Sequence, residues 1–127
     1  MAIHIASLDH LVLNVSSIED TVRFYEMLGM ERIRFDGRTA LRFGQHKINL
    51  HEAGREFTPH SRDPRPGSAD LCFLIGGTLD DAEAHLRAHG IAIELGPVPR
   101  TGAAGSIRSL YLRDPDGNLI ELSVSAE

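Results

Sequence analysis

The sequence lacks the features that mark several classes of protein. It contains one cysteine, which excludes an intrachain disulfide. No apolar run approaches the length of a membrane span, and the opening residues MAIHIASLDH have neither the basic nor the long apolar region of a signal peptide. The net charge is −5, whereas nucleic acids and anionic membranes attract clustered Lys and Arg. We therefore expect a cytoplasmic protein that binds neither nucleic acid nor a membrane.

The rest of the composition is that of an ordinary globular protein. A chain of 127 residues, 42% of them hydrophobic, suits a single domain over residues 1–127 with a core of useful size. The lone Cys72 lies in the apolar run LCFLI, which favours a packing or pocket-lining role over that of a nucleophile.

An internal repeat is the most informative pattern. The stretch LDHLVLNVSSIEDTVRFYEMLGMERI (8–33) matches ADLCFLIGGTLDDAEAHLRAHGIAIE (69–94) as strand, polar break, helix, glycine and strand. Capping pairs open both helices, Ser16 with Glu19 and Thr78 with Asp81, and Gly29 and Gly90 fit a left-handed residue after each helix.

The remaining segments predict the outline of an α+β fold. Strands are expected near 32–36, 39–44 and 46–53 in the first half, and near 91–95, 107–113 and 118–124 in the second. Each half is then a βαβββ module, the first over about 7–54 and the second over about 68–125. The polar, proline-containing segment 55–67 is expected to be a linker, and the Gly/Pro-rich segment 97–106 a mobile loop.

Alternation along the strands places polar residues on one face and apolar residues on the other. His10, His51, Asp70 and Glu121 fall on the polar face of four different strands, whereas Ile120 and Leu122 face the core. A sheet covered by helices on one side leaves its other face free to line a cup. Two imidazoles and a carboxylate there match a divalent-metal site, although solvent-exposed sheet faces also carry such residues without a chemical role.

These residues also resemble a known family. The segments LDHLVLNV, TVRFYEMLGM and YLRDPDGNLIEL resemble the glyoxalase/bleomycin-resistance/extradiol-dioxygenase superfamily, also called vicinal oxygen chelate. KINLHEAGREF and PGSADLCFL resemble its subgroup called glyoxalase domain-containing protein 5, whose bacterial members are often labelled virulence proteins. The resemblance implies paired βαβββ modules in a cup-shaped mixed sheet with helices outside, one divalent ion per site, and a homodimer.

The resemblance also implies roles for individual residues. His10 and Glu121 match metal positions on the first and last strands. The fourth-strand position is ambiguous, because internal symmetry aligns Asn49 with Glu121, while His51 lies two residues further along the same face. Asp70 replaces the usual fifth-strand histidine, so it is a possible ligand, a general base or a sign that metal has been lost. The expected set is therefore His10, His51 and Glu121 as ligands of Zn, Ni, Mn or Fe, with Glu121 or Asp70 as base. Expected substrate contacts are Tyr111, Asn49, Arg100 and Arg108.

Three activities follow from the resemblance. The first is a glyoxalase I-like isomerisation of a small carbonyl adduct with vicinal oxygens, through a metal-stabilised enediolate. The second is an Fe(II) extradiol-type dioxygenase, and the third is a dimer that sequesters a drug or metabolite without reaction. Because this scaffold supports many chemistries, the sequence alone does not choose among them.

Overall fold

The computed structural model describes residues 2–126. The chain divides between Pro66 and Gly67 into two compact units, which we call the first and second modules and describe separately. Both have the order strand, helix, strand, strand, strand, so the predicted βαβββ repeat is confirmed. Within the described residues, no helix has the length and apolar character needed to cross a membrane.

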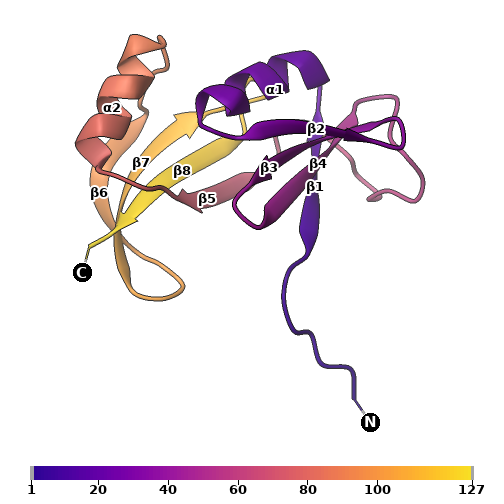
Figure 1. Cartoon of the computed structure of the whole chain (residues 1–127), viewed down its shortest axis with the longest axis horizontal. Coiled ribbons are helices and arrows are strands. Elements are labelled where there is room, and N and C mark those ends of the chain that lie inside the picture. Colours follow the sequence, from indigo (N-terminus) through magenta and orange to yellow (C-terminus); the bar gives the residue numbers. More distant parts are fainter. Residues whose placement is uncertain (1, 127) are drawn as a thin grey trace. The chain divides into compact units, whose positions relative to one another are not determined.

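The first module is a four-stranded mixed sheet with one helix (Figure 1). Strand β1 runs parallel to β4, and β4–β3 and β3–β2 are antiparallel, in the order β1-β4-β3-β2. Helix α1 contacts β2, β3 and β4. The elements are β1 (His10–Val15), α1 (Ile18–Met27), β2 (Glu31–Phe35), β3 (Arg38–Phe43) and β4 (His46–Glu52).

The second module repeats this topology in the order β5-β8-β7-β6. Strands β5 and β8 are parallel and the other pairs antiparallel, and α2 contacts β7. The elements are β5 (Asp70–Leu74), α2 (Leu79–Ala88), β6 (Leu95–Thr101), β7 (Ser106–Arg113) and β8 (Leu119–Ser125).

The two faces of each sheet differ as the alternation predicts. Leu13 and Val15 of β1 are buried, and so are Ile120 and Leu122 of β8, whereas Glu121 between the last two is partly exposed. Burial of these aliphatic side chains against the rest of each core contributes about 1.5–3 kcal/mol apiece. The apolar faces therefore supply most of the core of each module.

The helix ends confirm most of the predicted signals and correct one. Thr78 caps α2 by accepting a hydrogen bond from the Asp81 backbone N–H, and Gly29 and Gly90 have positive φ. The cap of α1, however, is Ser17 and not Ser16, because the Ser17 hydroxyl accepts from the Asp20 backbone N–H at 3.2 Å. The helix thus begins at Ile18, one residue later than a Ser16 cap predicts.

Half of the segment predicted as a loop over 97–106, residues 97–101, belongs to strand β6, and the strand expected over 91–95 is irregular as far as residue 94. Two prolines argued against a strand there. Because β6 is the edge strand and pairs only with β7, its prolines need not donate to a second neighbour. Only residues 102–105 remain a loop.

Candidate functional site

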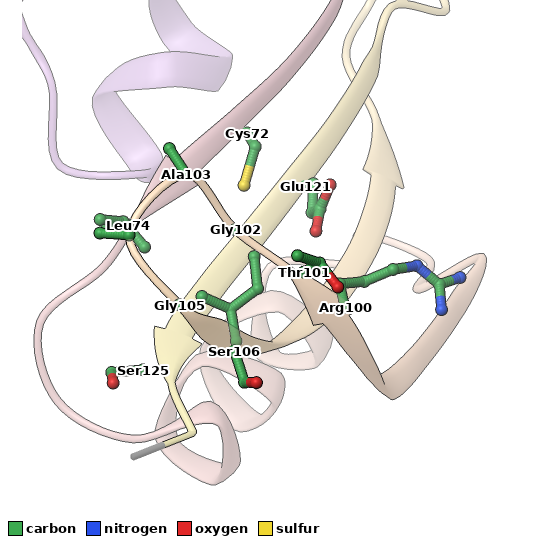
Figure 2. A pocket seen from close by; sticks show the side chains of 12 residues that line it. Cys72, Leu74, Arg100, Thr101, Gly102, Ala103, Gly105, Ser106, Glu121 and Ser125 are labelled. Carbon is green, nitrogen blue, oxygen red and sulfur yellow. The ribbon is translucent and has the colours of Figure 1, made fainter.

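The second module contains a pocket of about 500 Å³ on the polar face of its sheet (Figure 2). Strands β5 and β8 supply one side and the loop after β6 supplies the other. The volume lies within the range typical of small-molecule sites. The lining residues are Cys72, Leu74, Arg100, Thr101, Gly102, Ala103, Ala104, Gly105, Ser106, Ile107, Glu121 and Ser125.

The Glu121 carboxylate is the acidic group of this pocket, and two serines hold it. The Ser109 hydroxyl donates to Glu121 Oε2 at 2.5 Å, and the Ser123 hydroxyl lies 3.4 Å from the same oxygen. Ser109 and Ser123 are fully buried, are register partners on β7 and β8, and are hydrogen-bonded to each other at 2.7 Å. The carboxylate is therefore oriented through one oxygen by a rigid pair of hydroxyl groups.

Cys72 is the register partner of Glu121 and also lines the pocket. Its Sγ lies 3.2 Å from the Ser123 Oγ. Burial raises the pKa of the Cys72 thiol, and the nearby Glu121 carboxylate adds to this effect. Since the thiolate is the reactive form, a neutral thiol at pH 7 agrees with the pocket-lining role expected from the sequence.

Two cationic residues predicted at the site have different positions. Arg100 lines the Glu121 pocket, and its Nε donates to the Tyr111 hydroxyl at 2.9 Å. Tyr111 is the register partner of Glu121, so it stands on the same face of the sheet. Arg108 pairs with Val124 on the opposite face and lines a separate hollow beside the start of α2. Strand alternation therefore turns Arg108 away from the Glu121 pocket, and its expected contact with the substrate stays a prediction.

Asp70 begins β5 and is exposed. It stands on the same face as Cys72, two residues before it, and its charge contributes to the raised pKa of that thiol. It does not line the pocket that holds Glu121.

In the first module, His10 has a carboxylate partner that the sequence analysis did not identify. His10 Nδ1 lies 2.7 Å from Asp9 Oδ1, and this hydrogen bond lowers the pKa of Asp9. When Nδ1 donates to the carboxylate, Nε2 is left as the lone-pair nitrogen of the neutral ring. Histidines that bind metals commonly have such a second partner.

The strand register distinguishes between Asn49 and His51, the two candidate site residues on the fourth strand. Asn49 pairs with Val12, two positions beyond His10, just as Glu121 pairs with Cys72, two positions beyond Asp70. His51 pairs with Asn14, four positions beyond His10. At about 3.3 Å per residue, His51 is displaced about 13 Å along the strands from His10, but Asn49 only about 7 Å.

His51 is nonetheless a distinctive residue. Its side chain is buried, and Nδ1 has no hydrogen-bond partner; the same holds for Asn49 Oδ1. Desolvation lowers the pKa of His51, and the positive charge of Arg38 acts in the same direction. Among residues 2–126, no three His, Cys, Asp or Glu side chains are grouped closely enough to hold a metal ion.

The serines and Asp9 are the site residues that sequence reasoning missed. Ser123 lies two residues after Glu121 on the final strand, so the sequence already places both side chains on the same face. The Ser109 contact depends on the β7–β8 register, and the Asp9 contact depends on the conformation of adjacent residues. Neither is encoded in a local pattern.

Comparison with known proteins identifies the family. Residues 7–122 match the model described as the Glyoxalase/Bleomycin resistance protein/Dioxygenase superfamily. A glyoxalase domain-containing protein, RDO1 of Mycosarcoma maydis, is 54% identical over 120 residues, which are 94% of this chain and 68% of that protein. Virulence protein STM3117 of Salmonella typhimurium is 53% identical over 118 residues, 91% of this chain and 82% of that protein.

The similarity extends to solved structures. The crystal structure of STM3117 aligns with a TM-score of 0.95 over 98% of this chain and 100% of the other, at 51% identity. At 21% identity, a lactoylglutathione lyase from Agrobacterium tumefaciens shares the fold with a TM-score of 0.70, covering 94% of this chain and 95% of that one. The family match and the closely similar relatives together show that the chain belongs to the glyoxalase/bleomycin resistance protein/dioxygenase superfamily.

Proposed function

We propose that this protein is a divalent-metal-dependent enzyme of the glyoxalase type, which isomerises a small carbonyl adduct with Glu121 as the proton-transferring base. The observation that carries the proposal is the Glu121 carboxylate, fixed by Ser109 and Ser123 inside a pocket of ligand size. A base acts best when it is held at the position from which it must take the proton.

The donor chemistry of the polar faces fits a divalent metal. His10 has an imidazole whose Nδ1 is occupied by Asp9, Asn49 has a buried oxygen without a partner, and Glu121 has an oriented carboxylate. Nitrogen and oxygen donors of this kind suit hard or borderline ions such as Zn²⁺, Mn²⁺, Ni²⁺ or Fe²⁺. A bound ion of this class acts as a Lewis acid that polarises a carbonyl oxygen.

The chain's own groups account for the rest of the proposed reaction. Glu121 removes a proton next to the substrate carbonyl and returns it to the adjacent carbon, while Ser109 keeps the carboxylate oriented. Arg100, whose Nε is bonded to Tyr111, supplies a positive charge at the pocket for an anionic group of the substrate. Asp70 remains the alternative base at the start of β5.

For the fourth strand, the register argument leads us to propose Asn49 rather than His51 as the residue that accompanies His10. Asn49→Ala is expected to weaken Mn²⁺ or Zn²⁺ binding at least tenfold, because an amide oxygen near the ion is lost. His51→Ala is expected to change metal affinity less than threefold. Isothermal titration of metal-free protein measures both. The opposite ranking of the two variants would restore His51 as the ligand.

The activity experiment uses chelator-stripped protein reloaded with one ion at a time. Loss of the ultraviolet absorbance of the methylglyoxal–glutathione hemithioacetal is expected with at least one ion, and Glu121→Gln is expected to lower the rate at least 100-fold. Oxygen consumption with catechol, in place of isomerisation, would replace the proposal by the dioxygenase alternative. Tight ligand binding without turnover under every loading would replace it by sequestration.

A further inference from the structure

The pocket that contains Glu121 has an apolar side with no role in the reaction proposed above. Leu74 of β5 lines this pocket and is 75% exposed, although it is a large aliphatic residue. Cys72, two residues earlier on the same face, is also exposed, and its neutral thiol behaves as a small apolar group. A ligand in the pocket therefore covers apolar surface that is otherwise in contact with water.

The loop after β6 adds small apolar side chains to the lining. Ala103 and Ala104 form the middle of this loop, and both are exposed at the pocket. The Gly102 backbone N–H closes the loop by donating to the Gly105 carbonyl oxygen at 2.7 Å. The two alanines are thus held by a tight turn, and their methyl groups leave the room beside Leu74 to a ligand.

The charged groups of the pocket lie away from Leu74. In the strand order β5-β8-β7-β6, Leu74 and Arg100 stand on the two outer strands, and Glu121 stands on β8 between them. Figure 2 shows the Glu121 carboxylate between Leu74 and the Arg100 side chain. Among the described residues that line the pocket, Arg100 and Glu121 are the only charged ones. The pocket therefore has a charged side and an apolar side.

This polarity narrows the chemistry of the substrate. A charged substituent beside Leu74 would lose hydration without gaining an opposite charge, since Arg100 stands on the far outer strand. An apolar substituent gains free energy in proportion to the surface that it covers. An apolar cavity of about 150 Å³ holds a benzene ring, so a pocket of about 500 Å³ accommodates a ring together with a carbonyl group.

We propose that the substrate carries a phenyl-sized apolar group on its carbonyl carbon. Leu74, Ala103 and Ala104 contact this group, while the carbonyl end of the substrate faces Glu121. The inference rests on the proposed function for the role of Glu121, and it adds the class of substrate: an α-hydroxycarbonyl compound with an aromatic or bulky alkyl substituent. A methyl group in the same place would leave Leu74 exposed.

The test is an NMR titration of the full chain in the presence of EDTA, with 2-hydroxyacetophenone as the probe. Its matched analogue is hydroxyacetone, which has the same vicinal oxygens but a methyl group in place of the phenyl ring. The phenyl compound is expected to bind at least about tenfold more tightly, because its ring covers the apolar side of the pocket. It is also expected to cause saturable shifts of the methyl resonances of Leu74, Ala103 and Ala104.

Two variants complete the experiment. Leu74→Asn makes this side polar at nearly constant side-chain size, so affinity for 2-hydroxyacetophenone should fall about fivefold while affinity for hydroxyacetone stays the same. Because Leu74 is exposed, the variant should fold as the wild type does. Leu95→Asn changes another exposed leucine of the second module, one that does not line the pocket, and should leave both affinities unchanged.

The proposal is overturned if the two compounds bind the wild type equally, if the saturable shifts lie outside the pocket, or if Leu74→Asn binds 2-hydroxyacetophenone as the wild type does. The titration requires neither metal nor turnover. Failure of the isomerase assay would therefore leave the binding result intact, and equal binding of the two compounds would overturn the substrate class without deciding whether the protein is an isomerase.

Discussion

Asn118 shows how one residue ties together the starts of two neighbouring strands, β8 and β5. Its buried side chain donates to Asp114 Oδ2 at 2.7 Å and accepts from the Ala69 backbone N–H at 2.8 Å. The turn before β8 is thereby tied to the residue that precedes β5. The residues Asp114–Asn118 were predicted as a turn from their composition, but the link to Ala69 joins positions 49 apart and has no local signature.

Asn118→Ala is expected to lower the free energy of unfolding by about 3 kcal/mol, because it leaves the part-buried Ala69 N–H without its partner and removes the hydrogen bond to Asp114 Oδ2. Urea denaturation at pH 7 measures the loss. Gln45→Ala, at an exposed turn position of the first module, serves as the control and should change stability by less than about 0.5 kcal/mol. A loss below about 1 kcal/mol for Asn118→Ala would contradict the role given to this side chain.

His51 should make stability depend on pH. Burial lowers the pKa of His51 in the folded protein below 6.5, the usual value for histidine. As the pH falls, the unfolded chain therefore binds a proton at this residue before the folded protein does. The neutral buried ring thus contributes stability that is present above pH 6.5 and is lost toward the lower folded pKa. Between pH 7.5 and 5, wild type should lose more stability than His51→Gln when both are measured by urea denaturation. Parallel curves for the two proteins would show that His51 is not responsible.

At the scale of elements, alternation and helix signals predicted most of the fold. The faces of β1 and β8 follow directly from residues such as Leu13 and Ile120, because burial repeats every second residue. Strand β6 was missed because the tolerance of an edge strand for proline is a property of the sheet and not of the segment. The unpaired Nδ1 of His51 likewise depends on the register of β1 and β4, which no local pattern specifies.

Gly96 is the position where the missed strand is most constrained. Its φ is +117°, and a Cβ there would lie 2.4 Å from the Ser109 carbonyl oxygen and 3.1 Å from the Leu110 Cα. Both are backbone atoms of β7, so the steric overlap can be removed only if the strand that carries Ser109 shifts. Gly96→Ala is therefore expected to destabilise the protein by more than about 2 kcal/mol.

Gly37→Ala is the matched control for Gly96→Ala. Gly37 also has positive φ, +72°, but an added Cβ would meet nothing within 4 Å. Only the backbone strain of about 1 kcal/mol is then expected. Thermal unfolding of the two variants separates steric overlap from strain, and equal losses would mean that the close approach of β6 to β7 is unimportant.

At the scale of the whole molecule, the two modules have the same topology but different polar faces. The second module has Glu121 in a pocket with Arg100, whereas the first has His10 beside Asp9 and a buried His51. The donor chemistry of these groups is the basis for proposing a metal-dependent activity. We further propose that the protein is a homodimer.

The dependence of the protein on a divalent metal is tested by its metal content, measured by mass spectrometry after chelation, reloading with Mn²⁺, Zn²⁺, Ni²⁺ or Fe²⁺ and gel filtration. We expect about one ion per chain in wild type with at least one of these metals. Glu121→Gln should retain less than a tenth of that amount, whereas Arg108→Gln should retain all of it because Arg108 faces away from the pocket. Equal metal content in wild type and Glu121→Gln, or no metal in wild type with any ion, would contradict a metal site that depends on Glu121.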